Sequence, residues 1–284
     1  MKLLRVGEAG AERPAVMLES GEIIDVSSAV GEIGGPWLEG GGVGRLAGVL
    51  AEGSDRFPRV DAGTRIGAPV VRPGHIIAIG LNYADHAKEA GMDLPTEPII
   101  FTKAPSSYSG PDDDVLIPPG STKTDWEVEL GIVIGRSAEN LPDEAAAMEH
   151  VAGYCICNDV SERDFQLNHG PTWVKGKSAR TFCPTGPWLV TPDEIPDPQS
   201  LAMSLTVNGE VRQSGSTTTM IFGVAHLVHY ISKFMVLDAG DLIATGTPPG
   251  VGMGMKPPVF LKPGDVMELE IEGLGRQRQT LRQG

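Results

Sequence analysis

The sequence predicts a β-dominated α+β fold with few helices, and three observations support this. The chain has 284 residues, of which 37 are glycine and 23 are proline, and these are spread along its length. Such spacing suits short strands joined by tight turns and disfavours a helical bundle. Short apolar runs recur between the turns. Asn208-Gly209, a strong hairpin signal, stands between two strand-like segments.

Residues 1–70 are expected to form a small β-rich domain. It contains predicted strands at 2–6, 15–19 and 23–26 and one helix at 43–50. Around residues 70–74 the composition changes from a glycine-rich stretch to a continuous apolar run that is expected to form a strand. We take this change as the boundary with a second domain, 71–284, where the candidate chemistry is concentrated.

The second domain is expected to be built mainly from strands. Residues 76–81 and 151–159 are apolar enough for a buried sheet. Pro142 favours a helix start, because proline is tolerated in the first turn. The predicted strands are 76–81, 99–103, 127–135, 151–159, 201–207, 210–213, 241–245 and 266–271, and the predicted helices are 83–91, 142–150 and 220–235. Residues 106–120 are rich in turn signals.

Composition excludes several function classes. Lys and Arg number 23 against 37 Asp and Glu, which gives a net charge of −14. Nucleic acids and anionic membranes require a basic face, so neither is an expected partner. The three cysteines are too few for a disulfide framework, and no segment resembles a signal peptide or a membrane span. We therefore expect a cytoplasmic protein with reduced thiols.

A pair of acidic residues stands out in the strand 127–135. Glu127 and Glu129 are two residues apart and share one face, whereas Val128 and Leu130 lie on the other. Two like charges on one face are unfavourable unless a cation lies between them. Mg²⁺ meets that need, because it prefers carboxylate oxygens. An exposed strand face is the alternative.

Asp159 is a third acidic candidate, because it stands at the exit of the apolar strand 151–159, where functional residues often lie. Together with Glu127 and Glu129 it would form a three-carboxylate metal site with open positions. The alternative is that Asp159 caps a helix starting within 161–166.

His86 and Glu89 form the next candidate pair. Their i,i+3 spacing on a predicted helix puts imidazole and carboxylate on one face. A carboxylate orients an imidazole and raises its basicity, which suits a general base for water. A solvated ion pair on the surface is the alternative.

Two further segments carry groups that suit an anionic substrate. Lys175 and Lys177 could stabilise a developing oxyanion or enolate, although ordinary surface lysines remain the alternative. Thr245-Gly246-Thr247 ends a strand with hydroxyls and amides that could hold a carboxylate, and a strained turn is the alternative.

These motifs resemble the fumarylacetoacetate hydrolase family from about residue 76 to residue 272. Each motif alone is modest, but their order and spacing together are highly specific. The resemblance rests on Gly80-Leu81-Asn82-Tyr83-Ala84-Asp85-His86, Glu127-Val128-Glu129-Leu130-Gly131, Asn158-Asp159-Val160-Ser161-Glu162-Arg163, Lys177-Ser178 and Thr245-Gly246-Thr247-Pro248.

The resemblance implies a mixed β-roll that encloses a Mg²⁺ or Mn²⁺ site, usually in a homodimer. By matching motif positions it implies one role for each site residue. The implied metal ligands are Glu127, Glu129 and Asp159, the implied catalytic residues are His86, Glu89 and Lys177, and the implied substrate-binding residues are Tyr83, Gln166 and Thr247.

The implied activity is hydrolysis of a carbon–carbon bond in a 2,4-diketo acid. Leu81 stands where acylpyruvate-cleaving members commonly carry arginine, which argues against plain acylpyruvate specificity. Lyase, decarboxylase and isomerase activities of the same family are the alternatives. Outside enzymes, a carboxylate-rich cation-binding module is the other alternative.

Overall fold

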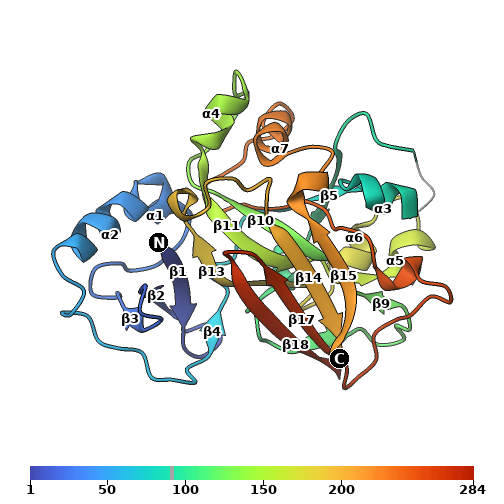
Figure 1. Ribbon diagram of the computed structural model, residues 1–284, viewed down its shortest axis with the longest axis horizontal. Coiled ribbons are helices and arrows are strands. Elements are labelled where there is room, and N and C mark those ends of the chain that lie inside the picture. The colour runs from blue at the N-terminus through green and yellow to red at the C-terminus, as the bar shows by residue number, and fades with distance from the viewer. Residues whose placement is uncertain (90–92) are drawn as a thin grey trace.

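The computed structural model describes residues 1–89 and 93–284, and strands dominate it (Figure 1). The predicted α+β class is confirmed. Most strands belong to two sheets, and the helices are short and lie at their margins (Figure 1). In the described part of the chain, no helix is both long and apolar enough to cross a membrane.

The larger sheet contains eleven of the described strands, in the order β3-β2-β1-β13-β11-β10-β16-β5-β6, with β4 on β1 and β7 on β13. Its strands are β1 (Lys2–Val6), β2 (Arg13–Met17), β3 (Ile23–Asp25), β4 (Ile66–Gly67), β5 (Ile76–Gly80), β6 (Ile99–Lys103), β7 (Tyr108–Ser109), β10 (Val128–Ile134), β11 (Val151–Asn158), β13 (Cys183–Val190) and β16 (Leu242–Ala244).

The second sheet runs β15-β14-β17-β18-β8, and a short pair, β12-β9, lies apart from both. These strands are β8 (Val115–Ile117), β9 (Thr124–Asp125), β12 (Ser161–Glu162), β14 (Ala202–Val207), β15 (Glu210–Ser216), β17 (Val266–Ile271) and β18 (Gly275–Gln283). The helices are α1 (Gly35–Glu39), α2 (Gly42–Ala51), α3 (Ala84–Glu89), α4 (Glu144–Met148), α5 (Arg163–Leu167), α6 (Val174–Lys177) and α7 (Val224–Ile231).

The main core lies between the two sheets. One side of β10 contributes Val128 and Leu130, and the facing sheet contributes Leu205 and Leu269, all within 1% of complete burial. Every residue of β10 and β11 is buried. Glu129 on β10 and Glu127 just before it are both buried, so the exposed-face alternative is wrong.

The N-terminal strands extend the larger sheet. β1 pairs antiparallel with β13, with Lys2 opposite Val190 and Leu3 opposite Leu189. A second apolar cluster spans both regions, since Leu3 and Ile24 share it with Ile76. The domain boundary at residues 70–74 stays a prediction.

Two predicted helices begin later than expected. Asp143 caps α4 by accepting a hydrogen bond from the Ala146 amide at 2.8 Å, so Pro142 lies before the helix rather than in its first turn. α7 begins after Gly223, not at residue 220. α3 is described from Ala84 to Glu89, and residues 90–91 of the predicted helix 83–91 lie outside the described residues.

Candidate active site

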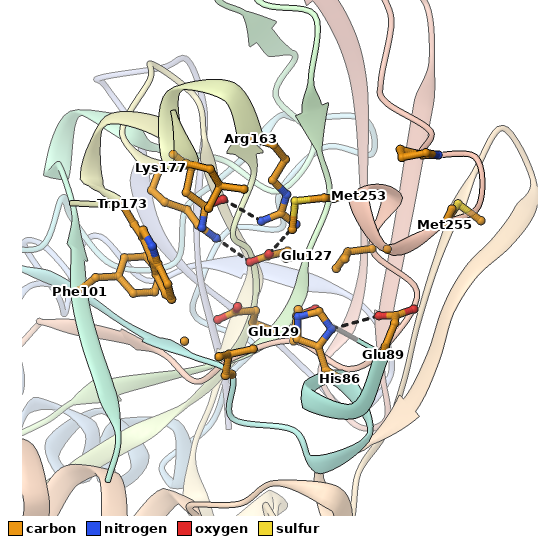
Figure 2. Close-up of a pocket in the computed structure, with 18 of the residues that line it drawn as sticks. His86, Glu89, Phe101, Glu127, Glu129, Arg163, Trp173, Lys177, Met253 and Met255 are labelled. Atoms are coloured by element: carbon orange, nitrogen blue, oxygen red, sulfur yellow. Dashed lines mark hydrogen bonds and ion pairs between the residues drawn. The ribbon is translucent and has the colours of Figure 1, made fainter. Parts of the chain in front are cut away.

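A cavity of about 570 Å³ opens where β5, β10, α3, α5 and α6 meet the loop after β16 (Figure 2). One part of its wall is charged and includes Glu127, Glu129 and Lys177. The remainder is largely apolar and is formed by Ile79, Leu81, Phe101, Leu167, Trp173, Val251, Met253, Met255 and Pro258. A charged end and an apolar end give the cavity an orientation for a ligand with the same two parts.

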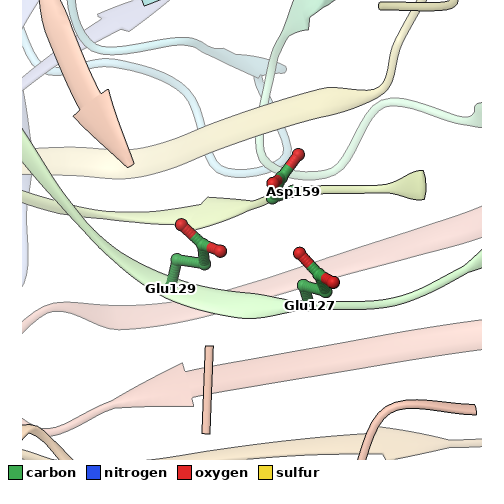
Figure 3. A group of neighbouring side chains, drawn as sticks. All are labelled: Glu127, Glu129 and Asp159. Carbon is green, nitrogen blue, oxygen red and sulfur yellow. The ribbon is translucent and has the colours of Figure 1, made fainter. Parts of the chain in front are cut away.

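Three carboxylates meet at the charged end (Figure 3). Glu129 lies on β10, and Glu127 lies just before its first residue rather than within the strand, in contrast to the predicted strand 127–135. Asp159 joins them because β10 and β11 are antiparallel, with Glu129 opposite Cys157, and because the Asp159 amide donates to the Glu127 carbonyl at 2.9 Å. One oxygen of each carboxylate lies within 4.8 Å of the other two.

Asp159 is not a helix cap. The residue that caps α5 is Glu162, whose side chain accepts a hydrogen bond from the Asp164 amide at 3.3 Å. Asp159 is completely buried, and its carboxylate accepts from two lysines instead. The capping alternative is therefore wrong.

Three buried cations surround the carboxylates. The Lys177 ammonium lies 2.7 Å from both Glu127 Oε2 and Asp159 Oδ2. Lys103 Nζ lies 2.5 Å from Asp159 Oδ1, and Arg163 Nη2 lies 2.7 Å from Glu127 Oε1. In Figure 2, Lys177 and Arg163 approach Glu127 from one side, and His86 lies on the other.

The electrostatics distinguish the two glutamates. Burial raises the pKa of Glu127, but Lys177 and Arg163 outweigh it and bring that pKa down to about 2. For Glu129, burial and the neighbouring charges of Asp159 and Glu127 all act in one direction and hold the pKa well above its ordinary value. Of the three carboxylates, Glu129 is the one with no cation within 4.0 Å among the described residues.

The donor set fits a hard divalent cation. Including Asp125, which pairs with Arg163 at 2.8 Å, the buried group holds four carboxylates against three cations, and 4 − 3 leaves one negative charge. A doubly charged ion would neutralise this excess and leave a positive site for an anionic ligand. Oxygen donors of this kind suit Mg²⁺ or Mn²⁺.

His86 and Glu89 face the same cavity from α3. His86 Nδ1 lies 3.1 Å from Glu89 Oε2, and both side chains line the wall opposite Lys177. Their side chains are 12% and 25% exposed, so the pair is not a fully solvated surface ion pair. Glu89 also accepts a hydrogen bond from the Gly250 amide at 3.1 Å, which ties α3 to the loop after β16.

The two candidate lysines differ sharply. Lys177 is 2% exposed and its pKa is raised, because Asp159 and Glu127 outweigh the lowering effect of burial. Its ammonium also lies 5.2 Å from the centre of the Phe101 ring. Lys175 is exposed, points elsewhere and donates to the His169 carbonyl. Lys175 is therefore an ordinary surface lysine, whereas Lys177 is not.

The predicted substrate-binding residues lie in three different settings. Gln166 lines the cavity and accepts from Arg163 Nη1 at 3.0 Å, and no acceptor among the described residues takes its amide hydrogens, which leaves them for a ligand. Thr247 also lines the cavity, but its hydroxyl already donates to the Val128 carbonyl at 2.9 Å. The Tyr83 side chain is packed in the core, where its hydroxyl donates to Met203 Sδ at 3.2 Å. Tyr83 does not line the cavity.

The loop geometry around Thr247 follows from one glycine. Gly246 has a φ of +97°, and a Cβ there would lie 2.8 Å from the Cβ of Asn82. This conformation directs the Gly246 amide to Glu129 Oε2 at 2.8 Å. Glycine is needed because other residues rarely adopt this backbone conformation.

Sequence reasoning did not identify several residues of the site. Lys103 ends a predicted apolar strand, as Asp159 does, and that position was an available signal. Arg163 was noted only as part of a motif. Met253 and Met255 gave no local signal, because their loop reaches the cavity through hydrogen bonds from the Gly252 and Met253 amides to Asp125.

Proteins with similar sequences and structures match the chain over almost its whole length. A curated protein of Burkholderia multivorans, named "Putative hydrolase", is 54% identical over 99% of both chains. The solved structure of maleylpyruvate hydrolase from Sphingobium sp. SYK-6, in complex with manganese(II) and pyruvate, is 30% identical, covers 100% of both chains and has a TM-score of 0.81.

An isomerase is also among the structural relatives. The 2-hydroxyhepta-2,4-diene-1,7-dioate isomerase from Mycobacterium marinum is 30% identical, with a TM-score of 0.78, and the match covers 100% of this chain and 98% of that one. The model of the fumarylacetoacetate (FAA) hydrolase C-terminal family matches residues 75–282, which include every predicted site residue. The chain therefore belongs to the fumarylacetoacetate hydrolase family and is an enzyme of that family.

Proposed function

We propose that this enzyme hydrolyses a carbon–carbon bond of a 2,4-diketo acid to give pyruvate and a second carboxylic acid. The proposed substrate is 2,4-diketo-3-deoxy-L-rhamnonate, or the corresponding L-fuconate, which would yield pyruvate and lactate. The observation that carries the proposal is that His86 and Glu89 line the same cavity as Glu127, Glu129 and Lys177. Water activation and enolate stabilisation are the two requirements of this reaction.

Substrate binding would use the charged end of the cavity. Glu127, Glu129 and Asp159 would hold Mg²⁺ or Mn²⁺, which when bound supplies a Lewis acid for the carboxylate and 2-oxo oxygens of the substrate. Gln166 has free amide hydrogens for the same end. The tail beyond the 4-oxo carbon would lie on the apolar wall that includes Leu81, Met253 and Met255, and its terminal methyl group fits such a surface.

Bond cleavage would follow from the proton transfers of His86. Its imidazole, oriented by Glu89, takes a proton from water, and the water oxygen adds to the 4-oxo carbon. The C3–C4 bond then breaks, and its electron pair forms pyruvate enolate. Lys177 stabilises the developing negative charge, and a proton on C3 completes the pyruvate. The released acid keeps the oxygen from water.

The rival activities keep the enolate but omit the attack by water. A ureidoglycolate lyase, an oxaloacetate-type decarboxylase and a 2-hydroxyhepta-2,4-diene-1,7-dioate isomerase belong to this group, and one structural relative bears the isomerase name. These activities need no base for water. The His86 and Glu89 pair favours hydrolysis for that reason.

A substrate screen in ¹⁸O water tests the proposal. The purified enzyme with Mg²⁺ or Mn²⁺ is given synthetic 2,4-diketo acids, including the rhamnonate and fuconate derivatives, beside ureidoglycolate, oxaloacetate and the dioate substrate of the isomerase. We expect ¹⁸O in the carboxylate of the released lactate by mass spectrometry. Turnover of a rival substrate with no cleavage of any diketo acid would overturn the proposal.

The homodimer implied by the family resemblance stays a prediction. Light scattering coupled to size-exclusion chromatography would test it, with a mass of twice the single chain expected. The choice between Mg²⁺ and Mn²⁺ is part of the same proposal, and titration of the metal-free enzyme with each ion would decide it.

A further inference from the structure

A second cleft, of about 550 Å³, lies between the N-terminal strands and the segments that lead away from the active site. It shares no lining residue with the catalytic cavity. Side chains from β1 and from the loop before β5 form one wall, and residues around 106–113 and 180–181 form the other. Neither the proposed chemistry nor the family motifs use this cleft.

Arginines distinguish the cleft from the rest of an acidic protein. Four of them, Arg5, Arg65, Arg72 and Arg180, line it, although the chain has a net charge of −14. Two are already paired. Arg65 makes two hydrogen bonds to Asp113, at 2.7 and 2.6 Å, and Arg5 lies 3.4 Å from a carboxylate of Glu12.

The other two arginines have no anionic partner. Within residues 1–89 and 93–284, no carboxylate oxygen lies within 4.0 Å of Arg72 or Arg180, and both side chains belong to exposed residues. Guanidinium groups of this kind bind carboxylate or phosphate through paired N–H donors. The cleft therefore has a surplus of positive charge that its own acids do not neutralise.

A polar group beside these arginines also lacks a partner. The Ser109 hydroxyl is buried at the cleft and has no hydrogen-bond partner among the described residues, which costs free energy unless a ligand or water supplies one. Thr181, next to Arg180, has a φ of +67°, which is an outlier for a β-branched residue. The fold itself holds this conformation, because the Thr181 hydroxyl accepts a hydrogen bond from the Leu116 amide at 2.8 Å.

We propose that this cleft binds a small anion that carries carboxylate or phosphate groups, with Arg72 and Arg180 as its main ligands. The Ser109 hydroxyl would donate a further hydrogen bond. The site is connected to Lys177 and Lys103 beside the carboxylate cluster by two short segments. One runs from Lys103 to Ser109 and the other from Lys177 to Arg180, and β7 and β13 pair in parallel just beyond them.

Isothermal titration calorimetry on the full-length, metal-free protein tests this site with inorganic phosphate, pyrophosphate and citrate as separate probes. We expect at least one probe to bind the unaltered protein. Arg72→Gln and Arg180→Gln should each weaken that binding about tenfold or more, because a hydrogen bond to a charged group contributes about 1.5–3 kcal/mol. Binding of phosphate would indicate a ligand with phosphate groups, and binding of citrate would indicate a ligand with carboxylate groups.

Arg276→Gln is the matched control, since Arg276 is 75% exposed on β18, away from the cleft. Its binding should equal that of the unaltered protein, and unchanged thermal unfolding in all variants would exclude misfolding. Binding that survives in the double variant would overturn the proposal, because the anion would then occupy another part of the protein. Failure of all three probes at about 10 mM would overturn it as well. Dissociation of an oligomer in the double variant, without loss of anion binding, would instead assign the arginines to a subunit contact.

Discussion

The carboxylate cluster and the α3 pair occupy one cavity but are built in opposite ways. Glu127, Glu129 and Asp159 are at most 6% exposed and are held by strands paired on both sides. His86 and Glu89 lie on α3, of which six residues are described, and their side chains are 12% and 25% exposed. The cluster is part of the core, whereas the pair belongs to the margin of the fold.

This difference in burial and support matches two different tasks, which are holding a cation and transferring a proton. A cluster of like charges has to be held rigidly, because its members would otherwise move apart and lose the geometry for a cation. Proton transfer to water needs an accessible base and a route for solvent, which a marginal helix provides. We therefore expect changes in the cluster to affect stability and metal binding together, and changes in α3 to affect turnover alone.

The largest effect is expected from Glu127→Gln. This change leaves the buried Lys177 and Arg163 with one anion fewer, which should cost about 3–5 kcal/mol of unfolding free energy. Activity should fall at least about a thousandfold, since a metal ligand is lost as well. Denaturant unfolding and metal titration measure the two effects. Glu149→Gln, at a 74% exposed position, is the control. Retained metal affinity in Glu127→Gln would contradict the expectation that changes in the carboxylate cluster affect stability and metal binding together.

His86→Ala should abolish most turnover without disturbing the cluster. Loss of a general base lowers kcat by about 10²–10⁴-fold. The affinity for Mn²⁺ should stay within about twofold, because His86 is not among the three grouped carboxylates. Steady-state kinetics and calorimetry give both values. His75→Ala, at a 59% exposed histidine, should leave both unchanged. If His86→Ala retained full turnover, His86 would not be the general base.

Two substitutions of Glu89 distinguish the effect of its negative charge on His86 from the effect of its hydrogen bond to the Gly250 amide. Glu89→Gln keeps an oxygen for the Gly250 amide but removes the negative charge beside His86, so kcat should fall only about tenfold. Glu89→Ala removes both and should fall further. Single-turnover rates of the two variants measure this step. Equal losses in both would show that the negative charge beside His86 accounts for the whole effect, whereas full activity in Glu89→Gln would show that the carboxylate acts only by fixing the loop after β16.

A smaller effect is expected from pH on the metal-free protein. The pKa of Glu129 is held above its ordinary value of 4.5, so the folded state binds this proton more tightly than the unfolded state. The resulting stability is complete below pH 4.5 and is lost as the pH rises through the raised pKa. Bound Mn²⁺ replaces the proton. The rise in Tm on adding Mn²⁺ should be several degrees larger at pH 8 than at pH 5.

The control for this pH effect is Glu129→Gln, which carries no titrating proton at that position. Its Tm shift with Mn²⁺ should be small and the same at both pH values. A larger metal-induced shift at pH 5 than at pH 8 in the unaltered protein would contradict the assigned direction of the Glu129 pKa.

The smallest effect is expected from Lys175→Ala. Lys175 is exposed and is two residues from Lys177, so its removal should change kcat/KM by about twofold at most. Lys177→Met, by contrast, should lose most activity, because it removes the ammonium between Glu127 and Asp159. Parallel kinetics on the two variants measure the contrast. Similar losses in both would argue against a buried role specific to Lys177.

Local patterns predicted the parts of the site that depend on short-range geometry. The spacing of Glu127 and Glu129 fixes a common face on any strand, and the spacing of His86 and Glu89 fixes a common face on any helix. The apolar runs at β5, β10 and β11 likewise identified the central strands, because their residues are buried on both sides.

Besides several strands of two or three residues, two long strands were missed because their sequences carry the opposite signals. β13 contains two prolines and a glycine within Cys183–Val190, which are typical of turns. β18 has the polar sequence GRQRQTLRQ, yet Gln277 and Gln279 are buried. The Gln277 amide donates to the Ile156 and Gly186 carbonyls, so it satisfies groups of the other sheet that no local pattern reveals.

The sequence by itself determined the fold class, the family and the residue types that the chemistry needs. The tertiary structure decided which of them meet. The register of β10 and β11 brings Asp159 beside Glu127, and the packing of α6 buries Lys177 while Lys175 stays in solvent. The physical reason is that side-chain spacing along an element follows from backbone geometry, whereas contacts between distant segments depend on pairing and packing over the whole chain.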